Sequence, residues 1–371
     1  MIKKQYKWLS FSILSILLAG CGLFSNQETT EPNPKPPTEE IEEIVPEDEN
    51  EPKETIDKQD LNVWLPRLDN VRYSYEGIGN EYATFDWTPQ FNQENYYQFV
   101  TDNGGTKTAE IYEYKENEVV RIFQRPETYF RDNFSEIGNF TDQREEEVIL
   151  KAPIEVGNSW SSNENDYEIT AIDHEIEVPA GTYQTIEVTI NMDDMVVKRY
   201  YAKDVGLVSE VSETEGMTIE SNLEIITTET PEVLPFFVYI PDEQAMGLDQ
   251  VEAELTLNTN DPARVAITQL LSGQNESYKE INILSEGAEI NYLFLNDENV
   301  VEVDVTSAFE ENMAGSTGEL FGIYTFVNTL SKYYGTQEVL LTVDGRPYNG
   351  SHITLEEGEV FTFNEEMVNE Q

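Results

Sequence analysis

The sequence predicts an α+β protein: an N-terminal antiparallel β-rich domain and then a small α/β domain, both following a disordered acidic tether. Three observations predict this order. Apolar and polar residues alternate with a period of two in residues 61–229, which is typical of antiparallel strands with one solvated face. Signals for helix starts and stops follow between residues 261 and 335. Residues 25–60 are rich in proline and acidic residues.

The first twenty residues have the parts of an export signal. Three lysines (Lys3, Lys4, Lys7) precede an apolar run from Trp8 to Leu18, which is too short to span a bilayer. The only cysteine, Cys21, stands directly after Leu-Ala-Gly, which is similar to the lipobox of bacterial lipoproteins. The resemblance implies cleavage between Gly20 and Cys21 and a diacylglyceryl group on the thiol. The alternative is an ordinary export signal that ends at a cysteine.

Residues 21–60 are expected to form the tether, and residues 25–60 carry its characteristic composition. They contain six prolines, thirteen acidic residues and three lysines. Such a segment buries too little apolar surface to offset its ordering entropy, and like charges keep it extended. At about 3 Å per residue it would reach roughly 100 Å. A proline-rich ligand for a partner domain is the alternative, but such ligands usually carry basic residues.

Residues 61–229 are expected to form the β-rich domain. Ile186, Val188 and Ile190 alternate with polar residues, and further strands are expected at 83–87, 96–101, 119–124, 167–173 and 196–202. Turn residues separate them at 102–105, 179–181 and 204–206. Residues 157–208 resemble a β domain that recurs in exported bacterial proteins.

The same region holds three tryptophans and many tyrosines. These rings either form core and cross-strand pairs or line a groove for a glycan or peptide. His174 follows Asp173, but no nucleophile motif stands beside the pair. His174 is therefore interpreted as a surface residue at a strand end.

Residues 231–360 are expected to form the α/β domain. One helix would start with Asp261 as N-cap and Pro262 as first residue, and would end at Gly273. Ser316 and Glu319 have the spacing of a capping box for a second helix. The expected inner face of that helix consists of Leu320, Ile323, Tyr324, Val327 and Leu330.

Strands are expected around these helices at 236–240, 251–257, 289–295, 299–305 and 338–343. In the strand 299–305 the valines would face inward, while Glu302 and Asp304 would face outward. Residues 361–371 are expected to be an acidic tail.

Residues spread over this second region resemble the GerMN domain of sporulation and spore germination proteins. The resemblance rests on 238–240, 261–264, 270–273, 301–305, 328–330 and 343–345. It implies an extracytoplasmic α/β module that works by protein contacts, similar to the ring-building modules of secretion-type complexes. The family-motif positions, expected to be structural, are Asp261, Pro262, Asp304, Asn328, Thr329, Asp344 and Gly345.

The sequence departs from the family pattern in two ways. It has Ser285 to Ala288 where the family tends to have a Pro-Gly turn, and it holds one such domain where the sporulation protein holds two. The second departure counts against a sporulation role for this chain.

The sequence has few of the motifs and residues that enzymes usually use for catalysis. The sequence contains no G-x-S-x-G, H-E-x-x-H or P-loop. A lipid on the Cys21 thiol would exclude it as a nucleophile. The two histidines, His174 and His352, stand far apart in the sequence and do not suggest a zinc site. We therefore expect no enzyme, no cofactor and no dedicated metal site, although paired carboxylates are too abundant to judge by counting.

Charge narrows the class of partner. Lys and Arg number 22 against 73 Asp and Glu, giving a formal net charge of −51, which disfavours nucleic acid and anionic lipid. We expect a scaffold or interaction module, lipid-anchored on the cell-wall side of the membrane, whose partners are other envelope proteins. Self-association stays open. The alternative is a peptidoglycan-binding or wall-remodelling protein that uses the aromatic β domain.

Overall fold

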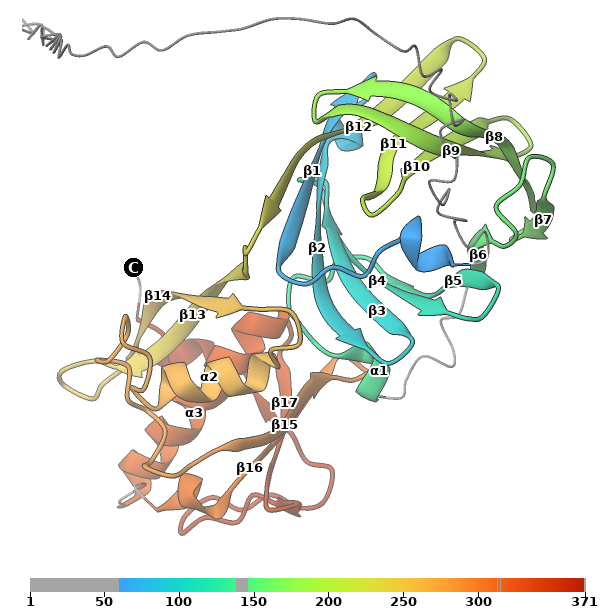
Figure 1. Cartoon of the computed structure of the whole chain (residues 1–371). Coiled ribbons are helices and arrows are strands. Elements are labelled where there is room, and N and C mark those ends of the chain that lie inside the picture. Colours follow the sequence, from blue (N-terminus) through green and yellow to red (C-terminus); the bar gives the residue numbers. More distant parts are fainter. Residues whose placement is uncertain (1–59, 138–145, 312, 314, 370–371) are drawn as a thin grey trace, which may run out of the picture. The chain divides into compact units, whose positions relative to one another are not determined.

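The computed structural model describes residues 60–137, 146–311, 313 and 315–369. Gly20, Cys21, the predicted signal and the predicted tether up to residue 59 lie outside these residues. The described residues belong to one compact unit. Its first part is an antiparallel β-sheet and its second part an α/β region, so the predicted α+β class is confirmed (Figure 1).

The first part is a twelve-stranded sheet with the strand order β6-β5-β4-β3-β2-β1-β12-β11-β10-β9-β8-β7. β1 pairs with both β2 and β12. The sheet therefore consists of two six-stranded meanders, β1–β6 and β7–β12, which join in its middle through its first and last strands in sequence. The strands are β1 (Val71–Ile78), β2 (Phe85–Gln93), β3 (Tyr96–Asp102), β4 (Lys107–Tyr114), β5 (Glu118–Arg125), β6 (Glu147–Lys151), β7 (Ser159–Ser162), β8 (Asn165–Val178), β9 (Gly181–Asn191), β10 (Val196–Ala202), β11 (Gly206–Thr214) and β12 (Met217–Thr228).

The two edges of this sheet, β6 and β7, are linked by side chains. The Trp160 indole Nε1 donates to the Val148 carbonyl oxygen at 2.9 Å, and the Val148 N–H donates to the Ser162 hydroxyl at 2.9 Å. The sheet is therefore nearly closed and barrel-like (Figure 1). Short helices flank it: η1 (Leu61–Val63), η2 (Glu81–Ala83) and α1 (Phe134–Ile137).

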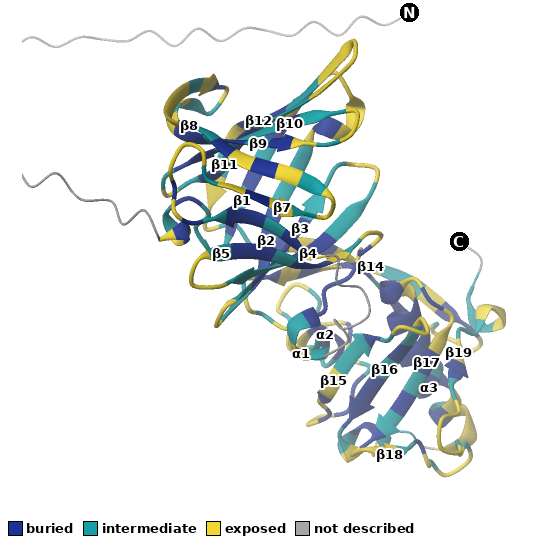
Figure 2. Ribbon diagram, turned by 90° about the vertical axis from the view of Figure 1, so that its right-hand side faces the viewer, coloured by how far each residue is buried: buried dark blue, intermediate teal, exposed yellow. Residues whose placement is uncertain are grey.

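Burial along the strands follows the predicted alternation where one face is solvated (Figure 2). Ile186, Val188 and Ile190 are all fully buried. On β4, by contrast, Ala109, Glu110 and Ile111 are buried in succession, since the outer face of that strand is covered. Ala109 and Ile111 belong to a hydrophobic cluster shared with the second region of the unit.

The second region has three layers. Helices α2 (Ala263–Leu271) and α3 (Gly315–Tyr334) contact strands of a two-stranded sheet and strands of a five-stranded sheet, and thus lie between the two sheets (Figure 1). The two-stranded sheet is β13 (Glu232–Pro241) and β14 (Leu248–Leu257). The five-stranded sheet consists of β15 (Ile290–Leu295), β16 (Val300–Val305), β17 (Glu338–Val343), β18 (Arg346–Pro347) and β19 (Phe361–Thr362); η3 (Ser307–Glu310) and η4 (Glu365–Met367) are short 3₁₀ turns.

Both helix starts differ from the prediction. The first helix begins at Ala263, one residue later, and the Asp261 carboxylate accepts instead from the backbone N–H of Asn258 at 2.8 Å. Ser316 lies inside α3, and Glu319 accepts from the N–H groups of a distant loop, 352–353, at 2.9 and 3.1 Å. The capping-box prediction is wrong because a tertiary contact uses the glutamate.

Other burial predictions for this region also need correction. Asp304, predicted to face solvent, is buried because β16 is an inner strand and its carboxylate has partners on both neighbouring strands. Leu320 is exposed, while α3 is buried on several sides between the two sheets. Residues 361–369, predicted as part of a tail, pair and pack with the domain through β19 and Val368.

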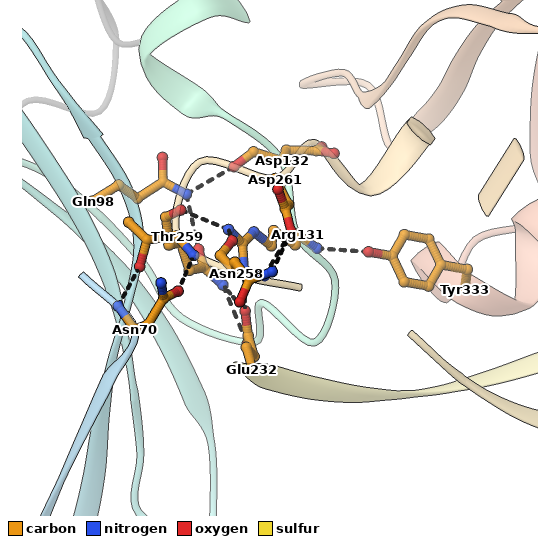
Figure 3. Close-up of polar contacts among 10 residues, drawn as sticks. Asn70, Gln98, Arg131, Asp132, Glu232, Asn258, Thr259, Asp261 and Tyr333 are labelled. Atoms are coloured by element: carbon orange, nitrogen blue, oxygen red, sulfur yellow. Dashed lines mark hydrogen bonds and ion pairs between the residues drawn. The ribbon is translucent and has the colours of Figure 1, made fainter. Parts of the chain in front are cut away.

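A buried polar network joins the two regions (Figure 3). Arg131, which follows β5, is fully buried and forms an ion pair with Glu232 at the start of β13, at 3.2 Å. Its guanidinium also donates to the carbonyl oxygens of Gln90 and Asn258, each at 2.6 Å. The carboxylate of the adjacent Asp132 accepts from the Tyr334 hydroxyl at 2.8 Å. These contacts and the shared hydrophobic cluster fix the β-sheet to the α/β region.

Candidate functional site

A cavity of about 190 Å³ lies within the barrel-like sheet. Side chains from β1–β5, β10 and β11 line it, together with Leu65 and Pro66, which follow η1. Its wall is mostly aromatic, with four charged side chains among the rings. An apolar cavity with a few convergent polar groups is the usual form of a small-molecule site.

The aromatic rings of the cavity pack against one another. Trp87 lies with its ring centroid 5.0 Å from that of Phe99 and 5.3 Å from that of Tyr73. Tyr75 stacks on Phe85 with centroids 4.3 Å apart. Such arrangements fix ring positions beyond what burial alone does.

Several tyrosine hydroxyls on this wall are engaged by backbone. The hydroxyl groups of Tyr73 and Tyr75 donate to the carbonyl oxygens of Val205 and Leu207, at 2.9 and 2.8 Å. Tyr114 and Tyr97 donate in the same way to the segment between η1 and β1. These tyrosines therefore hold loops to the sheet, and their rings line an interior cavity instead of a surface groove.

A chain of alternating charges crosses the cavity wall. Arg121 contacts Glu110 at 3.4 Å and Glu147 at 2.5 Å. Arg199 contacts Glu147 at 3.2 Å and Glu210 at 2.7 Å. Glu147 is thus shared between both arginines, and Glu110 and Glu210 are the ends of the chain.

The pKa values of these groups reflect their places in the chain. Burial raises the pKa of Glu110 and outweighs the opposing effect of Arg121. Burial also acts to raise the pKa of Glu147, but Arg199 and Arg121 together lower it below the ordinary value. The central carboxylate is therefore well compensated, whereas the Glu110 end is poorly compensated.

The family-motif residues lie in the second region, away from this cavity, and bond within their own region. Asp304 accepts from the Thr342 hydroxyl at 2.6 Å and the Gly345 N–H at 2.8 Å. Asp344 and Gly345 have φ of 47° and 73°, as a two-residue turn between β17 and β18 requires. The structure thus brings Asp304 and Gly345 together, and Asp344 is exposed at the turn.

Two further motif residues lie on α3. The Asn328 amide donates to the Asn364 carbonyl oxygen at 3.1 Å and accepts from the Asn364 N–H at 2.9 Å. The Thr329 hydroxyl accepts from the Tyr239 N–H at 3.0 Å. Pro262 directly precedes α2. The side chains of Asn328 and Thr329 thus connect α3 to the C-terminal segment and to β13.

The two histidines do not form a site with one another. His174 is exposed, as predicted, but it lies within β8 and not at a strand end, because β8 continues to Val178; it stacks on Tyr200 with ring centroids 5.6 Å apart. His352 contributes a backbone N–H to Glu319. In the described part of the chain, no group of three or more His, Cys, Asp or Glu side chains could hold a metal ion, and no helix has the length and apolarity to cross a membrane.

Residues 237–349 match the Germane family model, described as sporulation and spore germination. The second region is a Germane domain. This confirms the resemblance carried by residues 238–345. The match ends before β19, yet β19 and residues 363–368 pack against the matched part, so the folded Germane domain extends past it. A search of curated proteins finds no match.

Three solved structures are similar to parts of the chain. One is a candidate exported protein with a YmcC-like fold from Bacteroides fragilis, at 9% identity and TM-score 0.29, covering 44% of this chain and 98% of that one. A candidate lipoprotein from Parabacteroides distasonis has 12% identity and TM-score 0.27, covering 44% and 97%. The tandem GerMN domains of the Bacillus subtilis sporulation protein GerM have 19% identity and TM-score 0.26, covering 38% and 46%. These TM-scores are too low to support a functional conclusion.

The sequence reasoning missed the charged chain in the cavity, although a signal for it was present. Arg199 stands two residues from Val197 and Tyr201, both buried, and so shares their face of β10. Arg121 is likewise two residues from the buried Val119. A charged residue in phase with buried neighbours indicates an interior ion pair.

Proposed function

We propose that the protein is a lipid-anchored envelope protein whose Germane domain acts by contact with other extracytoplasmic proteins, without catalysis, in sporulation or germination. The Germane match over residues 237–349 carries this proposal. The bonds of Asp304, Asn328 and Thr329 support it, because these motif side chains stabilise the domain that presents the contact surface.

The connection between the two regions supports a scaffold in particular. Arg131 and Asp132 connect the β-sheet to the Germane domain through buried bonds. A partner bound to the Germane domain would then be held at a fixed position relative to the β-sheet. The tyrosine rings line an interior cavity of about 190 Å³ instead of a long surface groove, which favours the scaffold over the glycan-binding alternative.

Site-specific photocrosslinking in intact cells tests the contact. A photoreactive residue would replace Met246, which is 83% exposed in the β13–β14 hairpin, or Tyr292 on β15, which is 39% exposed. Ile225 on β12, which is 53% exposed, is the matched control outside the Germane domain. We expect discrete protein adducts from Met246 or Tyr292. Absence of adducts at both positions, or equal yields from Ile225, would contradict the proposal.

Lipid attachment needs its own test. We expect Cys21→Ala to abolish labelling of the chain by radioactive palmitate and to release the chain from the membrane fraction. Stable anchoring needs two or more acyl chains, and in this proposal Cys21 is the residue that carries them. Unchanged labelling would show that Cys21 is not the attachment site. Cosedimentation of the purified chain with peptidoglycan would in turn favour the wall-binding alternative.

A further inference from the structure

The charged chain in the cavity wall is not balanced. Arg121 and Arg199 each contact two glutamates, whereas Glu110 and Glu210 each contact one arginine through Oε2 among the described residues. With all five groups ionised, three carboxylates face two guanidinium groups. The excess negative charge therefore belongs to the ends of the chain, and both ends line the cavity.

The remainder of the wall favours a positive charge of low hydration. The faces of Trp, Tyr and Phe rings attract cations, and the attraction increases when water is excluded. Trp87, Phe99, Tyr75, Tyr112 and Tyr201 all line the cavity. The hydrogen bond from the Tyr75 hydroxyl to backbone fixes its ring before any ligand arrives, so binding would cost little ordering.

Other classes of ligand fit less well. An anion would add to the excess negative charge, and both arginines already bind two carboxylates each. A metal ion would need several ligands at one point, and no such group occurs in the described residues. A neutral apolar molecule would displace water from the carboxylates without replacing its hydrogen bonds.

Size and access set further limits. The cavity of about 190 Å³ exceeds the roughly 150 Å³ cavity that encloses benzene and is below the usual range for drug-sized ligands. Side-chain exposure rises from 9% at the central Glu147 to 19% at Arg199 and 33% at Glu210, whereas Glu110 at the other end is 11% exposed. Solvent therefore reaches the cavity from the Glu210 end.

We propose that this cavity binds a small organic monocation of the alkylammonium class, with its charge against the Glu110 and Glu210 ends and its alkyl groups against the aromatic rings. This site is separate from the contact surface of the Germane domain, and it stands or falls independently of the function proposed above.

Calorimetric titration of the purified chain with tetramethylammonium, choline and ethanolamine tests the proposal. We expect saturable binding of at least one of them, with a change in the fluorescence of Trp87 on the cavity wall. Two control compounds should not bind: the neutral isostere of choline, in which carbon replaces the nitrogen, and the anion acetate. Absence of saturation by all three cations, or equal binding of the neutral isostere, would overturn the proposal.

Variants then locate the charge. Glu210→Gln keeps shape and a hydrogen bond to Arg199 while removing an end charge, and should weaken binding about tenfold, which is one unit of log affinity. Glu213→Gln, on the exposed end of the same strand, is the matched control and should bind as the parent does. Glu110→Gln is the second variant if Glu210→Gln does not fold. Parental affinity in a folded end-charge variant would overturn the assignment.

Discussion

Replacing Arg131 with methionine should be among the most destabilising single changes in the protein. The arginine side chain is 0% exposed and its partner Glu232 is 6% exposed. Breaking a buried pair by removing one partner costs about 3–5 kcal/mol, because the other charge stays buried. Gln90 can still donate to Glu232 at 3.1 Å, but this neutral bond offsets only part of the cost.

The loss of two short hydrogen bonds adds to this figure. The Gln90 carbonyl oxygen keeps a second partner, the Asn260 N–H at 2.9 Å. The Asn258 carbonyl oxygen loses the guanidinium bond, which adds about 1 kcal/mol. We therefore expect Arg131→Met to lower the free energy of unfolding by about 4–6 kcal/mol, a large part of the roughly 5–15 kcal/mol that stabilises a domain.

Urea denaturation followed by tryptophan fluorescence and circular dichroism measures this change. Arg346→Met, at an exposed arginine on β18, is the control and should shift stability by no more than about 0.5 kcal/mol. Adding Glu232→Gln to Arg131→Met removes the orphaned charge and should recover part of the loss. A cost below about 1 kcal/mol for Arg131→Met would refute the argument from buried charge.

Three further predictions follow from other contacts. Burial raises the pKa of Asp132 from 3.8 to about 7, so between these pH values the native state holds a proton that the unfolded chain releases, and the free energy of unfolding should fall as pH rises from about 4 to 7. Urea titrations over this pH range should show a flatter pH dependence of stability for Asp132→Asn. The same pH dependence in Asp132→Asn and the parent would contradict this. Asn328→Ala removes both bonds to Asn364 and should cost about 1–3 kcal/mol, with faster hydrogen exchange in residues 361–369; parental exchange there would argue against the role of Asn328. Trp160→Phe removes the indole bond to Val148 and should cost about 1 kcal/mol, with faster exchange confined to β6 and β7, whereas faster exchange across the whole sheet would point to lost packing instead.

Much of the fold could be predicted because local signals and tertiary structure agree. Period-two alternation predicted β9, and Gly273, predicted to end the first helix, has the expected positive φ of 68°. The prediction failed where a distant segment decides the outcome. Asp304 looked solvent-facing by alternation, yet Thr342 and the Gly345 N–H supply its partners from another strand and turn. Glu319 looked like a cap, yet the backbone N–H groups from which it accepts lie 33 and 34 residues away.

The candidate cavity was less predictable than the fold. The sequence identified many aromatic rings but not whether they face inward or outward, because that depends on how a sheet curves and closes. Glu147, Arg199 and Arg121 lie on three different strands, and only the strand order of the sheet brings them together. Their separation in sequence gave no local pattern that linked them.

The linkage between β6 and β7 has a consequence for how copies of the protein meet. An open sheet edge presents unpaired N–H and carbonyl groups that can recruit a strand from another molecule. Here side chains of β7 occupy backbone groups of β6, because Trp160 and Ser162 bond the carbonyl oxygen and the N–H of Val148. Such protection against sheet-extending aggregation would suit a protein that, as proposed, is crowded on a membrane surface.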